Sequence, residues 1–180
     1  MGAGVSNWRL ARAVSQLGQL GVVSGTALDV ILARRLQEGD PDGDMRRALE
    51  RFPIPGMAQR ALDRYFVPGG KPADQSFKPI PRLSNQPVPA LVELIVLANF
   101  AEVFLAKEGH TGLVGINYLQ KIQLPTLPSL FGAMLAGVDY VLMGAGIPMA
   151  IPGLLDQLAR GAAARLSLEV EGAGPDEEFY

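Results

Sequence analysis

Two glycine-rich segments of nearly identical sequence are the parts of the chain best suited to contact a ligand. Residues 1–6 read Met-Gly-Ala-Gly-Val-Ser and residues 143–148 read Met-Gly-Ala-Gly-Ile-Pro, and each stands where a strand should pass into a helix. Glycines there let a flat ligand approach the main chain, and free helix N–H groups favour polar or anionic atoms. Parallel α/β proteins bind ligands at the carboxyl ends of strands. Asn7 and Met149 replace the third glycine of Gly-x-Gly-x-x-Gly, which disfavours a plain Rossmann site.

A predicted strand between these segments carries one polar side chain. The run Leu113–Leu119 is apolar except at Gly115 and Asn117, which is typical of a parallel strand buried on both faces. Asn117 either serves a ligand or bonds a neighbouring backbone group. Asp139 and Glu102 have no partner at a spacing suited to acid–base chemistry, so no catalytic residue is assigned.

This strand opens a predicted βαβ unit. Thr126 can cap the next helix, which continues with apolar residues at helical spacing until Gly137. Val138–Met143 is then a second buried strand. The crossover between two such parallel strands should be right-handed.

The N-terminal part shows the same alternation of helix and strand. Its predicted elements are a helix from Ser6 or Asn7 to Gly18, a strand over Leu20–Ser24, and a helix from Thr26 to residues 38–41. Asp29 follows Thr26 by three residues, a variant of the capping box at a helix start.

Residues 41–89 interrupt this rhythm as an insertion. Short helices are predicted over Met45–Phe52 and Pro55–Phe66, and prolines then exclude regular structure at positions 68, 72, 79, 81, 87 and 89. A connection of this length is usually functional or disordered. The insertion is predicted to be either an ordered cap over a site, or a surface excursion or oligomer contact.

The remaining elements complete a single α/β domain. They are a helix over Asn99–Lys107 after an apolar run from Ala90 that could begin as a strand, a helix from Pro152 to Gly161, and a strand over Leu166–Val170. Strands separated by helices predict a parallel sheet with helices outside, as a doubly wound sheet or as part of a (β/α)₈ barrel.

Composition narrows the function classes. A net charge of −2 and a pI near 5.4 argue against nucleic-acid binding. The chain has no cysteine, which excludes disulfides and thiolate chemistry and fits a reducing cytoplasm. The first residues do not form a signal peptide. Glu93, Asn99 and Glu102 interrupt the longest apolar stretch, so no membrane span is expected.

Three separated motifs resemble the nitronate monooxygenase (2-nitropropane dioxygenase-like) flavoproteins. They are the opening Met-Gly-Ala-Gly-Val-Ser with its helix and Gly-Gln-Leu-Gly-Val-Val-Ser-Gly, the strand Val-Gly-Ile-Asn-Tyr-Leu, and Val-Asp-Tyr-Val-Leu-Met-Gly-Ala-Gly-Ile-Pro. The likeness covers about residues 1–36 and 98–160. It implies an FMN-binding TIM barrel that oxidises alkyl nitronates with O₂, or a related FMN-dependent enoyl-acyl carrier protein reductase that acts on an enoyl thioester.

The resemblance also implies site residues. Gly2, Ala3 and Gly4 would pass the edge of the flavin ring, and Asn117 would hydrogen-bond that ring. Gln120 and Gln123 are further candidates for the same polar edge. The substrate side would be lined by Gly144, Ala145 and Gly146. No metal is implied, and the flavin would supply the electron chemistry.

Two family features are not among these 180 residues, namely the late phosphate-binding glycines and the Gly-Gly-His base. His110 lies in a superficially similar Glu-Gly-His-Thr-Gly, but before the strand that carries Asn117, and is expected to have no catalytic role. The chain would thus form the N-terminal part of a barrel, inactive alone and prone to form homo-oligomers through open edges, or a non-catalytic remnant.

Overall fold

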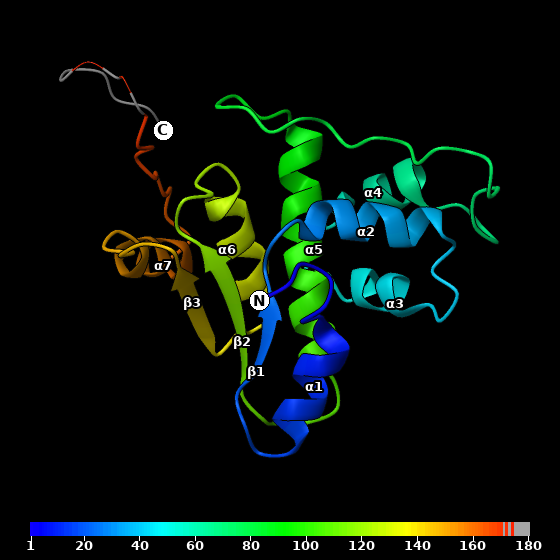
Figure 1. Cartoon of the computed structure of the whole chain (residues 1–180), viewed down its shortest axis with the longest axis horizontal. Coiled ribbons are helices and arrows are strands. Elements are labelled where there is room, and N and C mark those ends of the chain that lie inside the picture. Colours follow the sequence, from blue (N-terminus) through cyan, green and yellow to red (C-terminus); the bar gives the residue numbers. More distant parts are fainter. Residues whose placement is uncertain (171, 173, 175–180) are drawn as a thin grey trace.

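A computed structural model of the protein describes residues 1–170, 172 and 174 as a mixed α/β fold (Figure 1). The helices are α1 (Trp8–Gln16), α2 (Leu28–Gln37), α3 (Asp44–Glu50), α4 (Met57–Tyr65), α5 (Pro89–Lys107), α6 (Thr126–Leu135) and α7 (Ile151–Ala159). The strands are β1 (Gly21–Ser24), β2 (Val114–Leu119) and β3 (Tyr140–Gly144). The predicted order of helices and strands is confirmed up to α7.

The three strands form one parallel sheet in the order β1-β2-β3. The register places Val23 beside Ile116 and Ser24 beside Asn117. On the other side of β2, Leu142 of β3 also lies beside Asn117. The predicted βαβ unit is therefore confirmed, because α6 connects the parallel neighbours β2 and β3.

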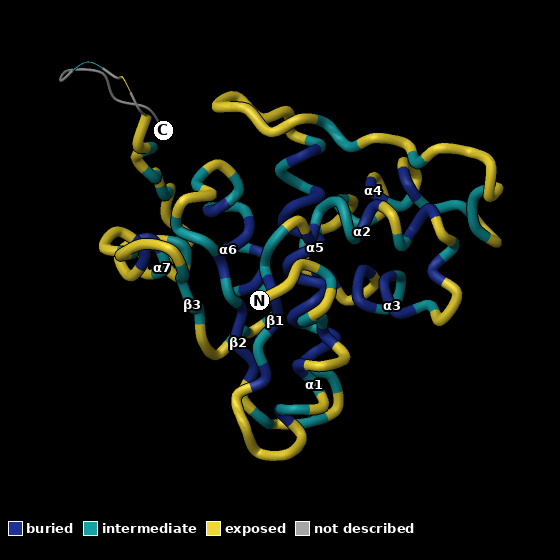
Figure 2. Tube along the Cα trace, in the orientation of Figure 1, coloured by how far each residue is buried: buried dark blue, intermediate teal, exposed yellow. Residues whose placement is uncertain are grey.

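One face of the sheet is sealed by helices. Val23, Val114 and Ile116 are fully buried there, and the Tyr118 hydroxyl lies 2.8 Å from Asn99 Oδ1 of α5 and 3.0 Å from the Ser129 carbonyl of α6. Figure 2 shows the buried residues gathered along α5 and the neighbouring strands. This contact fixes the two helices against β2.

The 19-residue helix α5 is the centre of the core. It begins with Pro89 at its first turn, so the prediction that the run from Ala90 could begin as a strand is wrong. The apolar residues of α5 lie on every side of the helix and not on one stripe. This pattern fits its position, because α5 packs against α1, α2, α3, α4 and α6. The helix is long and apolar enough to cross a membrane, but most of it is buried within the fold, as in the core helix of a globular domain.

Helix starts show which capping predictions hold. Asn7 caps α1 by accepting the Arg9 and Leu10 amides, as predicted. The prediction for Thr26 is wrong, since Ala27 occupies the N-cap of α2 and Asp29 lies near its own amide and that of Val30. Thr126 is not a cap either.

Thr126 is the first residue of α6, and its hydroxyl donates backwards to the Ile122 carbonyl at 3.1 Å. The strand predicted over Leu166–Val170 is also wrong. The Glu169 amide and carbonyl bond the Gln123 side chain in place of a neighbouring strand.

The insertion is ordered against the core. Helix α3 packs on α5, and α4 packs on both α2 and α5. The proline-rich stretch then runs back over α2 toward the start of α5 (Figure 1). Buried Gln37 holds it, because its Oε1 accepts the Lys78 amide at 2.6 Å and its main-chain carbonyl accepts the Lys71 amide at 2.8 Å.

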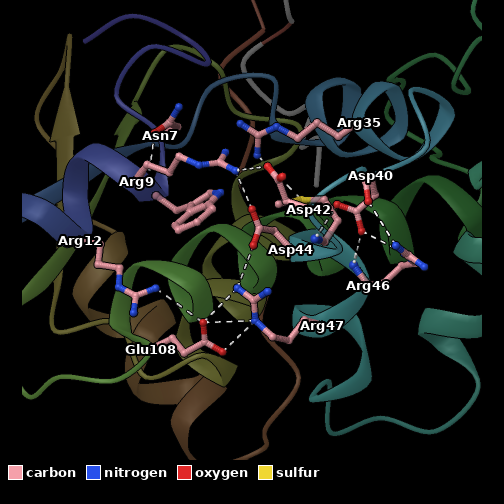
Figure 3. Close-up of polar contacts among 12 residues, drawn as sticks. Asn7, Arg9, Arg12, Arg35, Asp40, Asp42, Asp44, Arg46, Arg47 and Glu108 are labelled. Carbon is pink, nitrogen blue, oxygen red and sulfur yellow. Dashed lines mark hydrogen bonds and ion pairs between the residues drawn. The ribbon is translucent and has the colours of Figure 1, made fainter. Parts of the chain in front are cut away.

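Ion pairs join the insertion to α1 and to the C-terminal end of α5 (Figure 3). Arg9 of α1 bonds Asp44 at 2.6 Å, and Arg47 of α3 bonds both Asp44 and Glu108. Deeper in the fold, Glu102 of α5 pairs with Arg35 of α2 and accepts the Trp8 amide at 2.9 Å. Glu102 therefore links three helices through one carboxylate.

The acid side of the stability curve should depend on Asp139. Partial burial alone would raise the pKa of Asp139, but hydrogen bonds from Lys107 and the Val114 amide outweigh it, so the pKa is lowered. A lowered carboxyl pKa contributes stability above the unfolded pKa of about 4, and this contribution is lost as pH falls through the folded value.

We therefore expect Asp139→Asn to reduce the free energy of unfolding by about 1 kcal/mol at pH 7, and by less as the pH falls below about 4. Urea unfolding of both proteins at pH 7 and pH 3 measures this. An equal difference at the two pH values would contradict the assignment.

Candidate functional site at the carboxyl ends of the strands

Two strained turns follow the strands at one edge of the sheet. Ala27, after β1, has φ of 56°, and Ala145, after β3, has φ of 59°. Left-handed conformations are costly for residues other than glycine and gather at ligand sites. Ala145 is the central residue of the second Gly-Ala-Gly segment, so the predicted substrate-side turn is a tight one.

The sheet face opposite the helices carries small or polar residues at three positions and larger side chains at three others. We call it the open face, defined by Val22, Ser24, Gly115, Asn117, Tyr140 and Leu142, because alternation along each strand places these residues opposite the buried set. Tyr140 is 52% exposed, and Val22, Asn117 and Leu142 are half-buried. Leu142 lies over Gly115, and Asn117 Oδ1 lies near Gly144.

Ser24 is the polar residue of this face that sequence reasoning missed. Its hydroxyl is buried and has no hydrogen-bond partner within the described residues. Ser24 stands beside Asn117 in register, and its amide donates to the Ser6 carbonyl at 2.8 Å. The first glycine-rich segment is thereby held at the end of β1, next to the row that contains Asn117.

Gln120 and Gly146 are in direct contact at the same edge. The Gln120 amide donates to the Gly144 carbonyl at 2.8 Å, and a side chain added to Gly146 would come within 2.5 Å of Gln120 Oε1. The side-chain amide of Gln123 is instead bonded to the main chain of Glu169. Gln120 and Gln123 share a hollow of about 300 Å³ with residues 147–151.

The predicted site residues therefore form two groups along one edge. Asn117, the first glycine-rich segment and Gly144 adjoin the open face, whereas Gln120 and Gln123 face the hollow beside α7. His110 lies at the other edge, before β2, where its ring nitrogens bond the Ala106 carbonyl and the Gly112 amide. No group of three His, Asp or Glu side chains in the described ranges could hold a metal ion.

Fold and site together define a mixed α/β protein with a three-stranded parallel sheet and tight turns at its carboxyl edge. No protein-family model, curated protein or solved structure matches the chain.

Proposed function

We propose that this chain forms the N-terminal part of an FMN-dependent (β/α)₈ oxidoreductase of the nitronate monooxygenase type, which oxidises alkyl nitronates with O₂. The sequence resemblance motivates the proposal. The observation that carries it is the open face, where the unpartnered Ser24 hydroxyl and the Asn117 amide stand side by side at the strand ends.

Strand order also supports the barrel. Three parallel strands adjacent in chain order, linked by helical crossovers, are the repeating arrangement of a (β/α)₈ barrel. In that fold the open face would be the interior, and half-exposed Leu142 and exposed Tyr140 would be covered by further strands.

The residues fit the ring system of FMN better than its phosphate. A planar ring system needs a surface with few projecting atoms, which Gly144 helps to provide at the strand end, and a polar group for its edge, which Asn117 provides beside the buried Ser24. When bound, FMN would supply the redox chemistry. The chain would bind and orient the ring, with the turn at Gly144–Gly146 beside the substrate.

Flavin titration tests the proposal. Because the phosphate-binding glycines of this family are not among these residues, we expect riboflavin and FMN to bind with similar, weak affinity, measured by quenching of flavin fluorescence. Asn117→Leu should weaken both about tenfold, the cost of one polar contact. Asn85→Leu, in the exposed proline-rich stretch, is the control and should change nothing.

Failure to bind either flavin, or equal effects of the two asparagine variants, would contradict the proposal. Turnover distinguishes the reactions. Without the Gly-Gly-His base we expect O₂ uptake with propyl nitronate to stay near the flavin blank. Oxidation of NAD(P)H with an enoyl thioester would favour the enoyl reductase instead.

A further inference from the structure

A cavity of about 280 Å³ lies on the helix side of the sheet, away from the open face. Its walls come from the first turn of α2, the middle of α5, the first turn of α6 and the ends of β1 and β2. Ile80 and Leu83 of the proline-rich stretch also line it. The insertion therefore covers this cavity, as one of the two sequence predictions allowed.

Most of the cavity wall is apolar. Its apolar lining residues include Leu28, Val30, Ile95 and Ile122. Ile80 and Leu83 of the proline-rich stretch, here called the roof residues, cover them. Since an apolar cavity of about 150 Å³ holds benzene, this one has room for about ten non-hydrogen atoms. The size and lining suit a short aliphatic chain.

Asp29 is the acidic residue among those that line this cavity, and its charge also reaches Tyr65 of α4. It is half-buried on the first turn of α2, and it forms no ion pair with any residue that the structure describes. Burial raises the pKa of Asp29, although the amides of Val30 and Asp29 partly offset this. A carboxylate in such a place lacks the positive charge that would compensate its desolvation.

A second polar group faces the same space. Ser129 lines the cavity and is 3% exposed, and its hydroxyl makes no hydrogen bond to the described part of the chain. The other buried polar groups nearby are satisfied, because Asn99 donates to the Ile95 carbonyl and accepts from Tyr118. Asp29 and Ser129, together with the Thr26 hydroxyl, are the polar side-chain groups of the described lining that remain for a ligand.

We propose that this cavity binds a small primary alkylammonium ion, with its ammonium group on Asp29 and its alkyl chain between α5 and the roof residues Ile80 and Leu83. An ammonium group supplies three donors and one positive charge, which match a carboxylate and a hydroxyl. An anionic ligand would meet repulsion from Asp29, and a neutral alcohol would leave the charge uncompensated. The binding requires no flavin.

Calorimetric titration of the whole chain with n-hexylammonium, hexan-1-ol and hexanoate tests this at pH 7 and constant ionic strength. We expect hexylammonium to bind most tightly, hexanol more weakly and hexanoate not measurably. Asp29→Asn should weaken hexylammonium about tenfold or more, because a charged hydrogen bond is lost. Asp156→Asn, an exposed acid on α7, is the matched control and should leave binding unchanged.

Equal binding of hexanoate or hexanol by the wild type would overturn the proposal, and this ranking stands even if a variant fails to fold. No binding of hexylammonium, or equal affinity in the wild type and Asp29→Asn, would also overturn it.

Discussion

Replacing Glu102 with glutamine should lower the free energy of unfolding by about 3 kcal/mol, near the lower end of what breaking a buried ion pair costs. Glu102 is 3% exposed, pairs with Arg35 and accepts the Trp8 amide. Glutamine keeps the shape and one acceptor but removes the negative charge. Arg35 would then remain largely buried without a counter-charge, and one of the two hydrogen bonds that join α5 to α1 and α2 would be replaced by a donor facing a donor.

Urea unfolding measures this loss, and Glu93→Gln on the same helix is the control. Glu93 pairs with Arg60, whose side chain is 58% exposed, so removing this pair should cost under about 1 kcal/mol. Equal effects of the two substitutions would show that Glu102 does not act through burial.

Gly132→Ala should destabilise the protein by about 3 kcal/mol, because it overpacks a close helix crossing. Gly132 lies on α6 where this helix crosses α5, and a Cβ there would stand 2.1 Å from the Val96 carbonyl oxygen. The two helices would have to separate, and their shared contacts with Tyr118 would be disturbed.

Gly153→Ala is the matched control for this substitution. Gly153 lies in α7, and no described residue outside that stretch of helix comes within 4 Å of its missing Cβ, so alanine should be neutral or stabilise by about 0.5–1 kcal/mol. Thermal unfolding of both variants tests the pair. A melting temperature of Gly132→Ala close to that of the wild type would contradict the described crossing.

Much of the fold was predictable because local patterns and tertiary packing agree. The apolar run around Asn117 and the helical stripe before Gly137 each specify one kind of element, and both formed. The capping prediction for Thr126 failed for a local reason, because Thr126 is the first residue of α6 and its hydroxyl donates to the Ile122 carbonyl instead of accepting a helix amide. Residues 166–170 alternate like a strand, yet Gln123 takes the Glu169 backbone groups.

The candidate site was predictable only in part, for a similar reason. Glycine-rich turns can be recognised from the sequence. In the structure the first of them is bonded to β1 next to Ser24 and Asn117. Ser24 gave no signal, because an isolated serine in an apolar strand resembles many others. The cavity at Asp29 depends on how the proline-rich stretch folds back, which no local pattern specifies.

The open face as a flavin site is the central claim, and hydrogen–deuterium exchange with and without saturating FMN tests it most directly. We expect flavin to slow exchange at residues 22–25, 115–119 and 142–146, which form the open face and its strand-end turns. Helices α3 and α4 should not change. Protection confined to these helices or to the cavity around Asp29, or no protection at saturation, would contradict the claim.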